Sequence, residues 1–136
     1  MMQKVLVGTD TSASADIAVQ AAADLAKVHD AELLVLYVRA PGQSSDAANP
    51  KKVADPDGYL AQMTSRFPGV RVRSWAEPGN PADQLCEVAA DERVDAIVVG
   101  NKGVHGPRWR VRESVPTMVV RHSPCSVFIV DTRKAQ

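Results

Sequence analysis

The sequence alternates short, unbroken apolar runs with a longer segment whose apolar residues repeat every three or four positions. The runs at 4–9, 32–38, 95–99 and 126–130 are rich in valine and other apolar residues, which is typical of strands buried on both faces. Residues 13–30 instead place alanine, leucine, isoleucine and valine on one helical stripe. Alternation of this kind indicates β–α–β units, in which right-handed helical crossovers join parallel strands.

Further segments complete the order of elements. Residues 57–67 predict a short helix that ends before a Pro-Gly pair. Residues 70–76 alternate apolar and polar side chains, as a half-exposed edge strand does. Asn80 caps the next predicted helix, which has Pro81 at its first position, and residues 114–122 predict the last helix.

These elements predict a single α/β domain over residues 1–136, with a five-stranded parallel sheet, doubly wound, and helices on both faces. The strand order of such a sheet is 3-2-1-4-5, and its ligands bind at the carboxyl ends of the strands beside the switch point. Those two strands are 4–9 and 95–99. The segments that follow them, 9–12 and 100–114, are therefore expected to meet in one crevice.

Charge and composition argue against several classes of protein. Sixteen Lys and Arg side chains balance sixteen Asp and Glu side chains, so the chain as a whole has no electrostatic attraction for nucleic acid or an anionic membrane. No apolar stretch approaches the roughly 20 residues that a membrane-spanning helix needs. Cys86 and Cys125 are far apart in apolar surroundings, which favours reduced thiols over a metal site. We expect a cytoplasmic protein with no nucleic-acid or membrane partner.

The segment 100–112, GNKGVHGPRWRVR, combines positive charge with glycine and contains no acidic residue. Glycine lets backbone amides approach a ligand closely, and the segment leads into a helix whose free N–H groups favour an anion. These features favour a phosphate site, although a solvated loop that needs glycine for its turns would have the same composition. The candidate contacts in the segment and at the helix start are Gly100, Lys102, Gly103, His105, Gly106, Ser114 and Val115.

The ends of the first two strands hold further candidates. Asp10 is placed to hold a ribose hydroxyl or a Mg²⁺ that bridges phosphates, or simply to bond turn amides in an Asx turn. Thr9 and Thr11 flank Asp10 in the same segment. Val38 ends the second strand, where its backbone is placed to contact an adenine edge, while its side chain is expected to pack in the core.

The stretch 98–130, VVGNKGVHGPRWRVRESVPTMVVRHSPCSVFIV, resembles the carboxyl-terminal signature of the universal stress protein family. In that family a Gly-x2-Gly-x9-Gly-Ser/Thr pattern binds ATP phosphates and precedes a helix and an RHxPCxVxxV ending. Gly100, Gly103 and Ser114 match the pattern, and 121–130 matches the ending. The stretches VLVGTDTSASADIAVQAAADLA and GNPADQLCEVAADERVDAIVVG also match, so the resemblance covers nearly the whole chain apart from residues 40–75.

Two residues depart from the family pattern. Glu113 stands at the third glycine, which lies against the phosphates in nucleotide-binding members. Like charges a few ångströms apart repel by several kcal/mol at an effective dielectric near 20. Micromolar binding is worth only about 8 kcal/mol, so a Glu113 carboxylate that faced the phosphates would be enough to abolish micromolar ATP binding. Glu113 could instead turn outward and pair with Arg110 or Arg112, or it could coordinate a metal. The second departure, Thr11 in place of a glycine next to the aspartate, is milder because threonine is small and polar.

The resemblance implies a cytoplasmic stress-response regulator or sensor that binds ATP with Mg²⁺, or a related adenine nucleotide. The implied metal ligand is Asp10. No enzyme is expected, because the chain lacks a G-x-S-x-G elbow and its histidines are scattered, so any ATP hydrolysis would be slow and incidental. The nucleotide contacts implied by the resemblance are Thr9, Asp10, Thr11, Val38, Gly100, Lys102, Gly103, His105, Gly106, Ser114 and Val115.

The alternative is a stress protein that binds no nucleotide and acts by association. The strand 126–130 is expected at a sheet edge, where an apolar strand stays exposed unless it pairs. Family members dimerise through this strand, and a two-fold pair of such edges would bury both copies. We therefore expect a homodimer through 126–130 under either interpretation.

Overall fold

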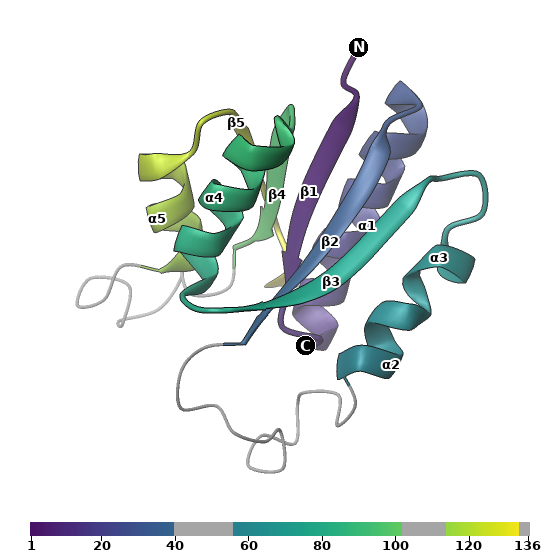
Figure 1. The fold of residues 1–136 in the computed structure, drawn as a ribbon, viewed down its shortest axis with the longest axis horizontal. Coiled ribbons are helices and arrows are strands. Elements are labelled where there is room, and N and C mark those ends of the chain that lie inside the picture. The colour runs from purple at the N-terminus through teal and green to yellow at the C-terminus, as the bar shows by residue number, and fades with distance from the viewer. Residues whose placement is uncertain (40–55, 102–113, 134–136) are drawn as a thin grey trace.

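The computed structural model describes residues 1–39, 56–101 and 114–133, and its strands form one five-stranded sheet (Figure 1). The neighbouring strands pair in parallel in the order β3-β2-β1-β4-β5, which confirms the predicted doubly wound sheet. The strands are β1 (Lys4–Thr9), β2 (Glu32–Arg39), β3 (Val72–Pro78), β4 (Ala96–Gly100) and β5 (Ser126–Val130).

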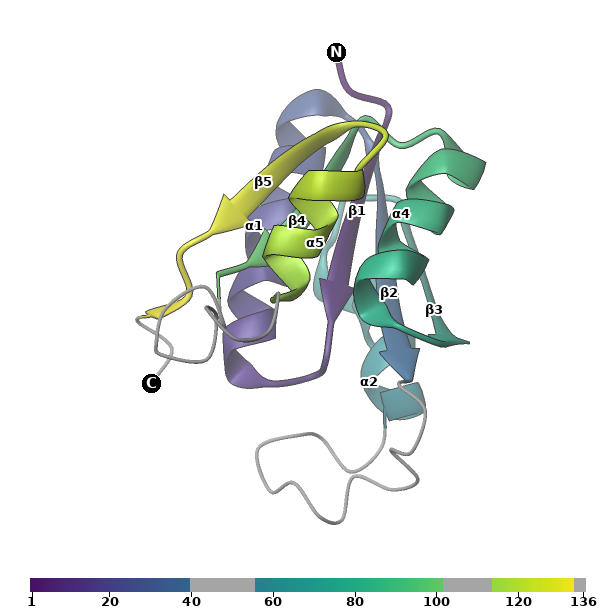
Figure 2. The same ribbon diagram turned by 90° about the vertical axis from the view of Figure 1, so that its left-hand side faces the viewer.

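Helices cover both faces of this sheet (Figures 1 and 2). One face carries α1 (Ala13–His29), α2 (Pro56–Ala61) and α3 (Met63–Arg66), and the other carries α4 (Pro81–Glu92) and α5 (Val115–His122). Successive side chains of a strand point to opposite faces, so Val5 and Val7 of β1 pack with α1, whereas Leu6 packs with α4. The core therefore consists of two apolar layers separated by the sheet.

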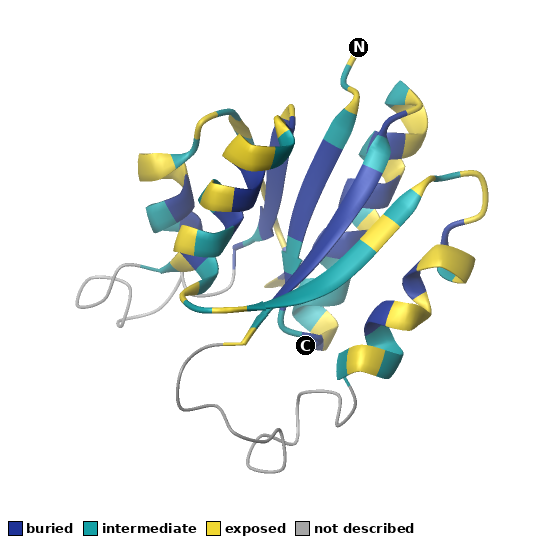
Figure 3. Ribbon diagram, viewed as in Figure 1, coloured by how far each residue is buried: buried dark blue, intermediate teal, exposed yellow. Residues whose placement is uncertain are grey.

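Burial decreases from the centre of the sheet to its edges (Figure 3). The side chains of Val5, Leu6 and Val7 in β1 are fully buried, whereas β3 is half-buried and β5 exposes Phe128 and Ile129. The edge position predicted for the third strand is thus confirmed. Among the helices of the described ranges, none combines the length and apolar character needed to cross a bilayer.

Three helices follow the carboxyl end of a strand, and each of them begins at a capping side chain. Ser12, Asn80 and Ser114 each accept a hydrogen bond from the backbone amide three residues later, at 3.2, 3.1 and 3.3 Å respectively. The helices that begin there are α1, α4 and α5. Their first turns therefore lie at the same edge of the sheet.

Two predicted elements differ from those observed by more than one residue. The helix predicted over 57–67 is divided into α2 and α3, because the Gln62 amide is shared at 3.3 Å between the carbonyl oxygens of Gly58 and Tyr59. The strand predicted over 70–76 runs instead from Val72 to Pro78. Its start is later because the residue at position 70 still donates its amide to the carbonyl of residue 67, within a turn.

An ion-pair cluster holds α2 and α3 against α1. Arg66 Nη1 donates to Asp16 Oδ1 at 2.5 Å and Nη2 donates to Oδ2 at 2.8 Å, while the Tyr59 hydroxyl donates to Asp16 Oδ1 at 2.6 Å. Burial raises the pKa of the Asp16 carboxyl, but the hydrogen bonds from Arg66 and Tyr59 outweigh burial and hold this pKa below its ordinary value. Burial, together with the Asp16 carboxylate, raises the pKa of Tyr59 to about 12.

We expect the Asp16→Asn variant to be less stable than the wild type by about 1–2 kcal/mol at neutral pH, a figure reduced for the partial exposure of the pair. A depressed folded-state pKa stabilises the protein above the unfolded-state pKa, which is near 4, and this stabilisation is lost as the pH falls through the folded-state value. Urea unfolding should therefore show a constant difference between the two proteins near neutral pH and a shrinking difference below about pH 4.

The matched control is Asp24→Asn in the same helix, because Asp24 is exposed and accepts only a hydrogen bond from the Gln20 side chain among the described contacts. This variant should change the free energy of unfolding little at either pH. If the difference in the free energy of unfolding between the wild type and Asp16→Asn did not shrink below about pH 4, the ion pair would not be the source of that difference.

Candidate functional site

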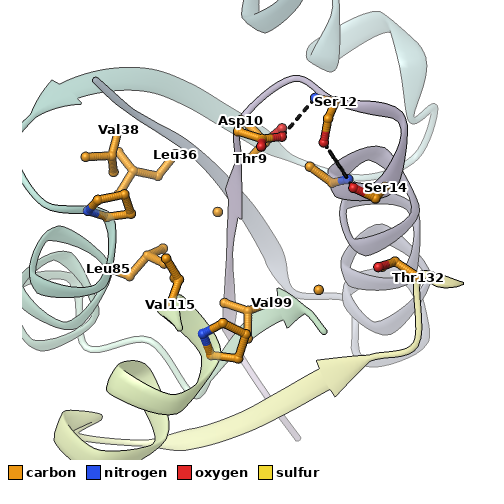
Figure 4. Close-up of a pocket in the computed structure, with 15 residues that line it drawn as sticks. Thr9, Asp10, Ser12, Ser14, Leu36, Val38, Leu85, Val99, Val115 and Thr132 are labelled. Atoms are coloured by element: carbon orange, nitrogen blue, oxygen red, sulfur yellow. Dashed lines mark hydrogen bonds between the residues drawn. The ribbon is translucent and has the colours of Figure 1, made fainter. Parts of the chain in front are cut away.

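A cavity of about 300 Å³ lies at the carboxyl ends of β1, β2 and β4 (Figure 4). It lies at the switch point of the sheet, where the chain leaves the central strands toward opposite faces, and this is the place that the strand order predicts. Its lining comes from these strand ends, from the first turns of α1, α4 and α5, and from the segment after β5.

One half of the cavity is apolar. Leu36 and Val38 of β2 line it from the sheet, and Leu85 of α4 lines it from the helical layer (Figure 4). Pro81, at the start of α4, also lines it. A Cβ atom at Gly8 would lie 3.0 Å from Leu85 Cδ1, so any larger residue at this position would displace the leucine. The missing side chain at Gly8 therefore lets α4 approach β1 closely, and together these residues form a surface suited to a flat apolar ring.

The other half carries short polar side chains from the turn between β1 and α1. The Ser12 amide donates to Asp10 Oδ1 at 2.9 Å, which is the Asx-turn bond considered from the sequence. The Ser12 and Ser14 hydroxyls are 3.2 Å apart, and Thr132 lies beside them at the end of the cavity (Figure 4). Within the described part of the chain, Asp10 Oδ2 has no hydrogen-bond partner, so this oxygen remains free for a ligand.

The turn itself depends on an unusual backbone conformation at Thr11. Its φ is 68°, in the left-handed region that a β-branched residue rarely adopts. Thr11 is buried, does not line the cavity, and donates its amide to Thr9 Oγ1 at 2.9 Å. A glycine at this position would adopt this φ without the Cβ penalty. Thr11 therefore turns the chain so that Asp10 and Ser12 both line the cavity.

The end of β4 is fastened to the segment after β5. The side-chain oxygen of Asn101 accepts from the Thr132 amide at 2.9 Å and from its hydroxyl at 3.0 Å, and both residues are buried. The Asn101 amide donates to the Val130 carbonyl at 2.9 Å. A Cβ atom at Gly100 would lie 3.1 Å from Thr132 Cγ2, so the glycine leaves room for Thr132 to reach the cavity.

The structure brings together part of the predicted nucleotide site. Ser114 caps α5 next to the cavity, and Thr11 lies behind the turn. The contact of each of these residues with a nucleotide stays a prediction. The predicted residues that line the cavity are Thr9, Asp10, Val38, Gly100 and Val115. Those that lie outside the described residues are Lys102, Gly103, His105, Gly106 and the motif departure Glu113.

Several lining residues were missed by the sequence prediction, among them Ser14, Ala15, Leu85 and Thr132. The same carboxyl-edge rule could have found the first two and the last, because the start of α1 and the segment after β5 must lie at that edge. No sequence signal singles out Leu85, because it belongs to the apolar stripe that also buries α4.

Asp10 was the predicted Mg²⁺ ligand. In the ranges that the structure describes, no group of three His, Cys, Asp or Glu side chains is close enough to hold a metal ion. A carboxylate oxygen is nevertheless the donor type that Mg²⁺ prefers, and Mg²⁺ commonly takes its other ligands from substrate phosphates and water. Asp10 therefore fits a metal that arrives together with a nucleotide.

Comparison with known proteins agrees with the geometry. The sequence profile of the universal stress protein family matches residues 1–131. The universal stress protein Sll1654 of Synechocystis sp. is 32% identical over 136 residues, which cover 96% of this chain and 86% of the relative.

Two solved structures extend the comparison. A universal stress protein in complex with cAMP matches with a TM-score of 0.83 and 29% identity, over 96% of this chain and 98% of that chain. The universal stress protein from Archaeoglobus fulgidus in complex with dAMP matches with a TM-score of 0.67 over 95% and 98% of the chains, and at 18% identity it shows the shared fold alone. Because the family profile and the Synechocystis relative both extend over nearly its whole length, the chain belongs to the universal stress protein family.

Proposed function

We propose that this protein is a cytoplasmic stress-response regulator or sensor that binds an adenine nucleotide in the cavity beside β1 and β4. The observation that carries the proposal is the division of the cavity into two chemically different halves. An adenine ring suits the apolar half beside Leu36, Val38 and Leu85. A ribose and phosphate suit the polar half, where Asp10 and the first turn of α5 supply an oxygen ligand and a positive helix end.

The solved relative in complex with cAMP supports this assignment, because it matches this chain over nearly the full length of both proteins. The more specific form of the proposal is that the bound nucleotide is ATP together with Mg²⁺. In that form Asp10 contacts the ribose or the metal, and the Val38 backbone contacts adenine. The amides of Gly100 and Gly103 hold phosphates, and so do Ser114 and Val115 at the start of α5. A cytoplasmic location agrees with Cys86 and Cys125, which are both free thiols in the structure.

Isothermal titration of the nucleotide-stripped protein tests the proposal. The ligands are ATP with Mg²⁺, cAMP and AMP, and GTP is the control nucleotide, because its base is guanine instead of adenine. We expect a micromolar dissociation constant, about 8 kcal/mol, for at least one adenine nucleotide and weaker binding of GTP. The Ala15→Phe variant should weaken binding by about tenfold or more, because Ala15 lines the cavity and the larger side chain fills it.

Ala13→Phe is the matched control, because Ala13 is exposed in the same helical turn and does not line the cavity. It should bind as the wild type does. Failure of the wild type to bind any adenine nucleotide would contradict the proposal for this protein as it stands. Titration of Glu113→Gly, which restores the glycine of the motif, would then show whether one side chain closes the site.

A second candidate function, association of two copies, is favoured by the outer edge of β5. This strand ends the sheet order, and within the described chain its outer edge has no partner strand. Phe128 and Ile129 are 41% and 48% exposed, and Val120 of α5 is exposed as well. An apolar strand with an unpaired edge tends to pair with another strand. We propose a homodimer in which two β5 strands pair antiparallel about a two-fold axis.

The Ile129→Lys variant should dissociate this dimer, because it would place two charges at the paired edges. Val28→Lys is the matched control, since Val28 is 75% exposed near the carboxyl end of α1 and lies outside β5. Sedimentation velocity should give a dimer for the wild type and Val28→Lys and a monomer for Ile129→Lys. A wild-type protein that stays monomeric at high concentration would rule out this mode of association.

A further inference from the structure

A buried amide side chain just after β4 fixes one residue of the cavity wall, Thr132. Asn101 Oδ1 accepts hydrogen bonds from the Thr132 amide at 2.9 Å and from the Thr132 hydroxyl at 3.0 Å. Asn101 Nδ2 donates to Asp131 Oδ1 at 3.3 Å, and the backbone amide of Asn101 donates to the Val130 carbonyl at 2.9 Å. We call these contacts the Asn101 clamp.

The clamp continues the pairing of β4 with β5 beyond the end of the two strands. Their register ends where Gly100 lies opposite Val130, and Thr132 comes two residues later. Asn101 and Thr132 are only 7% and 3% exposed, so neither side chain can exchange these hydrogen bonds for water without a desolvation cost. The clamp therefore holds the Thr132 side chain in one rotamer at the cavity.

The direction of these hydrogen bonds is fixed by their chemistry. A backbone N–H can only donate, so the side-chain atom of Asn101 that meets the Thr132 amide must be the oxygen. The same oxygen accepts the hydrogen of the Thr132 hydroxyl. A hydroxyl has one hydrogen, so the Thr132 oxygen keeps only its lone pairs for a ligand. Thr132 is therefore suited to a ligand group that donates a hydrogen bond.

The neighbouring hydroxyls have a different capacity. The oxygens of Ser12 and Ser14 are 3.2 Å apart, so one hydroxyl donates to the other, and the second keeps its hydrogen among the described contacts. This serine pair can donate to a phosphate oxygen, which accepts hydrogen bonds, whereas Thr132 cannot.

The position of Thr132 narrows the choice of donor. Thr132 lies at the opposite end of the cavity from Leu36 and Val38 (Figure 4). An adenine ring in the apolar half places its amino group away from Thr132. The remaining donors of an adenine nucleotide are the hydroxyls of its sugar.

We propose that Thr132 accepts a hydrogen bond from a ribose hydroxyl of the bound nucleotide, and that Asn101 is the positioning residue that fixes the Thr132 hydroxyl for this contact. This inference rests on the proposed nucleotide-binding function. It deepens that function by making the sugar a recognised group, so that the site prefers a ribonucleotide to its deoxy analogue.

The test is a titration with ATP, 2′-deoxy-ATP and 3′-deoxy-ATP, each with Mg²⁺. The wild type should bind at least one deoxy analogue about three- to tenfold more weakly than ATP, which corresponds to one hydrogen bond. Thr132→Val keeps the branched shape and the backbone bond to Asn101 but removes the hydroxyl. It should bind ATP and that analogue equally, whereas Thr132→Ser, which keeps a hydroxyl, should retain the preference for ATP.

The role of Asn101 has a second readout, amide hydrogen exchange at Thr132. Asn101→Ala should speed this exchange about three- to tenfold and lose the preference for ATP. The control is Ser74→Ala, which removes a half-buried hydroxyl that donates to the Leu60 carbonyl at 2.7 Å and does not line the cavity. It should leave both quantities within about twofold of the wild type, after correction for global stability by urea unfolding.

Equal affinity of the wild type for ATP and both deoxy analogues would overturn the inference and leave the proposed function standing. A preference for ATP that Thr132→Val retains would also overturn it, because another residue would then contact the hydroxyl. Thr132→Val that weakens ATP and the analogue by the same factor would show a merely structural role. A wild type that binds no nucleotide would overturn the proposed function as well, so the two failures are distinguishable.

Discussion

The parallel pairing of β1 with both β2 and β4 is the interaction on which the rest of the structure depends. Val5 lies opposite Leu33 on one side and Ala96 on the other, so β1 is hydrogen-bonded along both edges and buried on both faces. Right-handed crossovers then place α1 on one face and α4 on the other. The cavity opens between these helices because the chain leaves the central strands in opposite directions.

The chemistry of the cavity follows from the helix starts and side chains that meet at the carboxyl edge of the sheet. Three capped helices begin there, and their positive ends favour a negatively charged ligand. Gly8 and Gly100 lack the side chains that would displace Leu85 and Thr132. Small residues in the strands and helix starts around them thus create the space and the electrostatic preference, while Asp10 supplies an anionic oxygen that suits a hydroxyl or a metal.

Local strain at this edge of the sheet is supported by a contact only two residues away. Thr11 adopts a backbone conformation that glycine would adopt more easily, and the Thr9 hydroxyl accepts its amide. The first turn of α1, which follows this turn, is held from far along the chain, because the Tyr59 hydroxyl, 43 residues beyond Asp16 in sequence, donates to the Asp16 carboxylate.

By itself, the sequence determined the strand order and the edge at which the site lies, because valine-rich runs and helical stripes are local patterns and parallel crossovers have one hand. It also placed Asp10, Val38 and Gly100 at that edge. Only the tertiary structure decided that Leu85 and Thr132 line the cavity, that 57–67 divides into two helices, and that Tyr59 meets Asp16. These outcomes depend on how side chains from distant segments pack together, and no local pattern of apolar residues specifies which of them will touch.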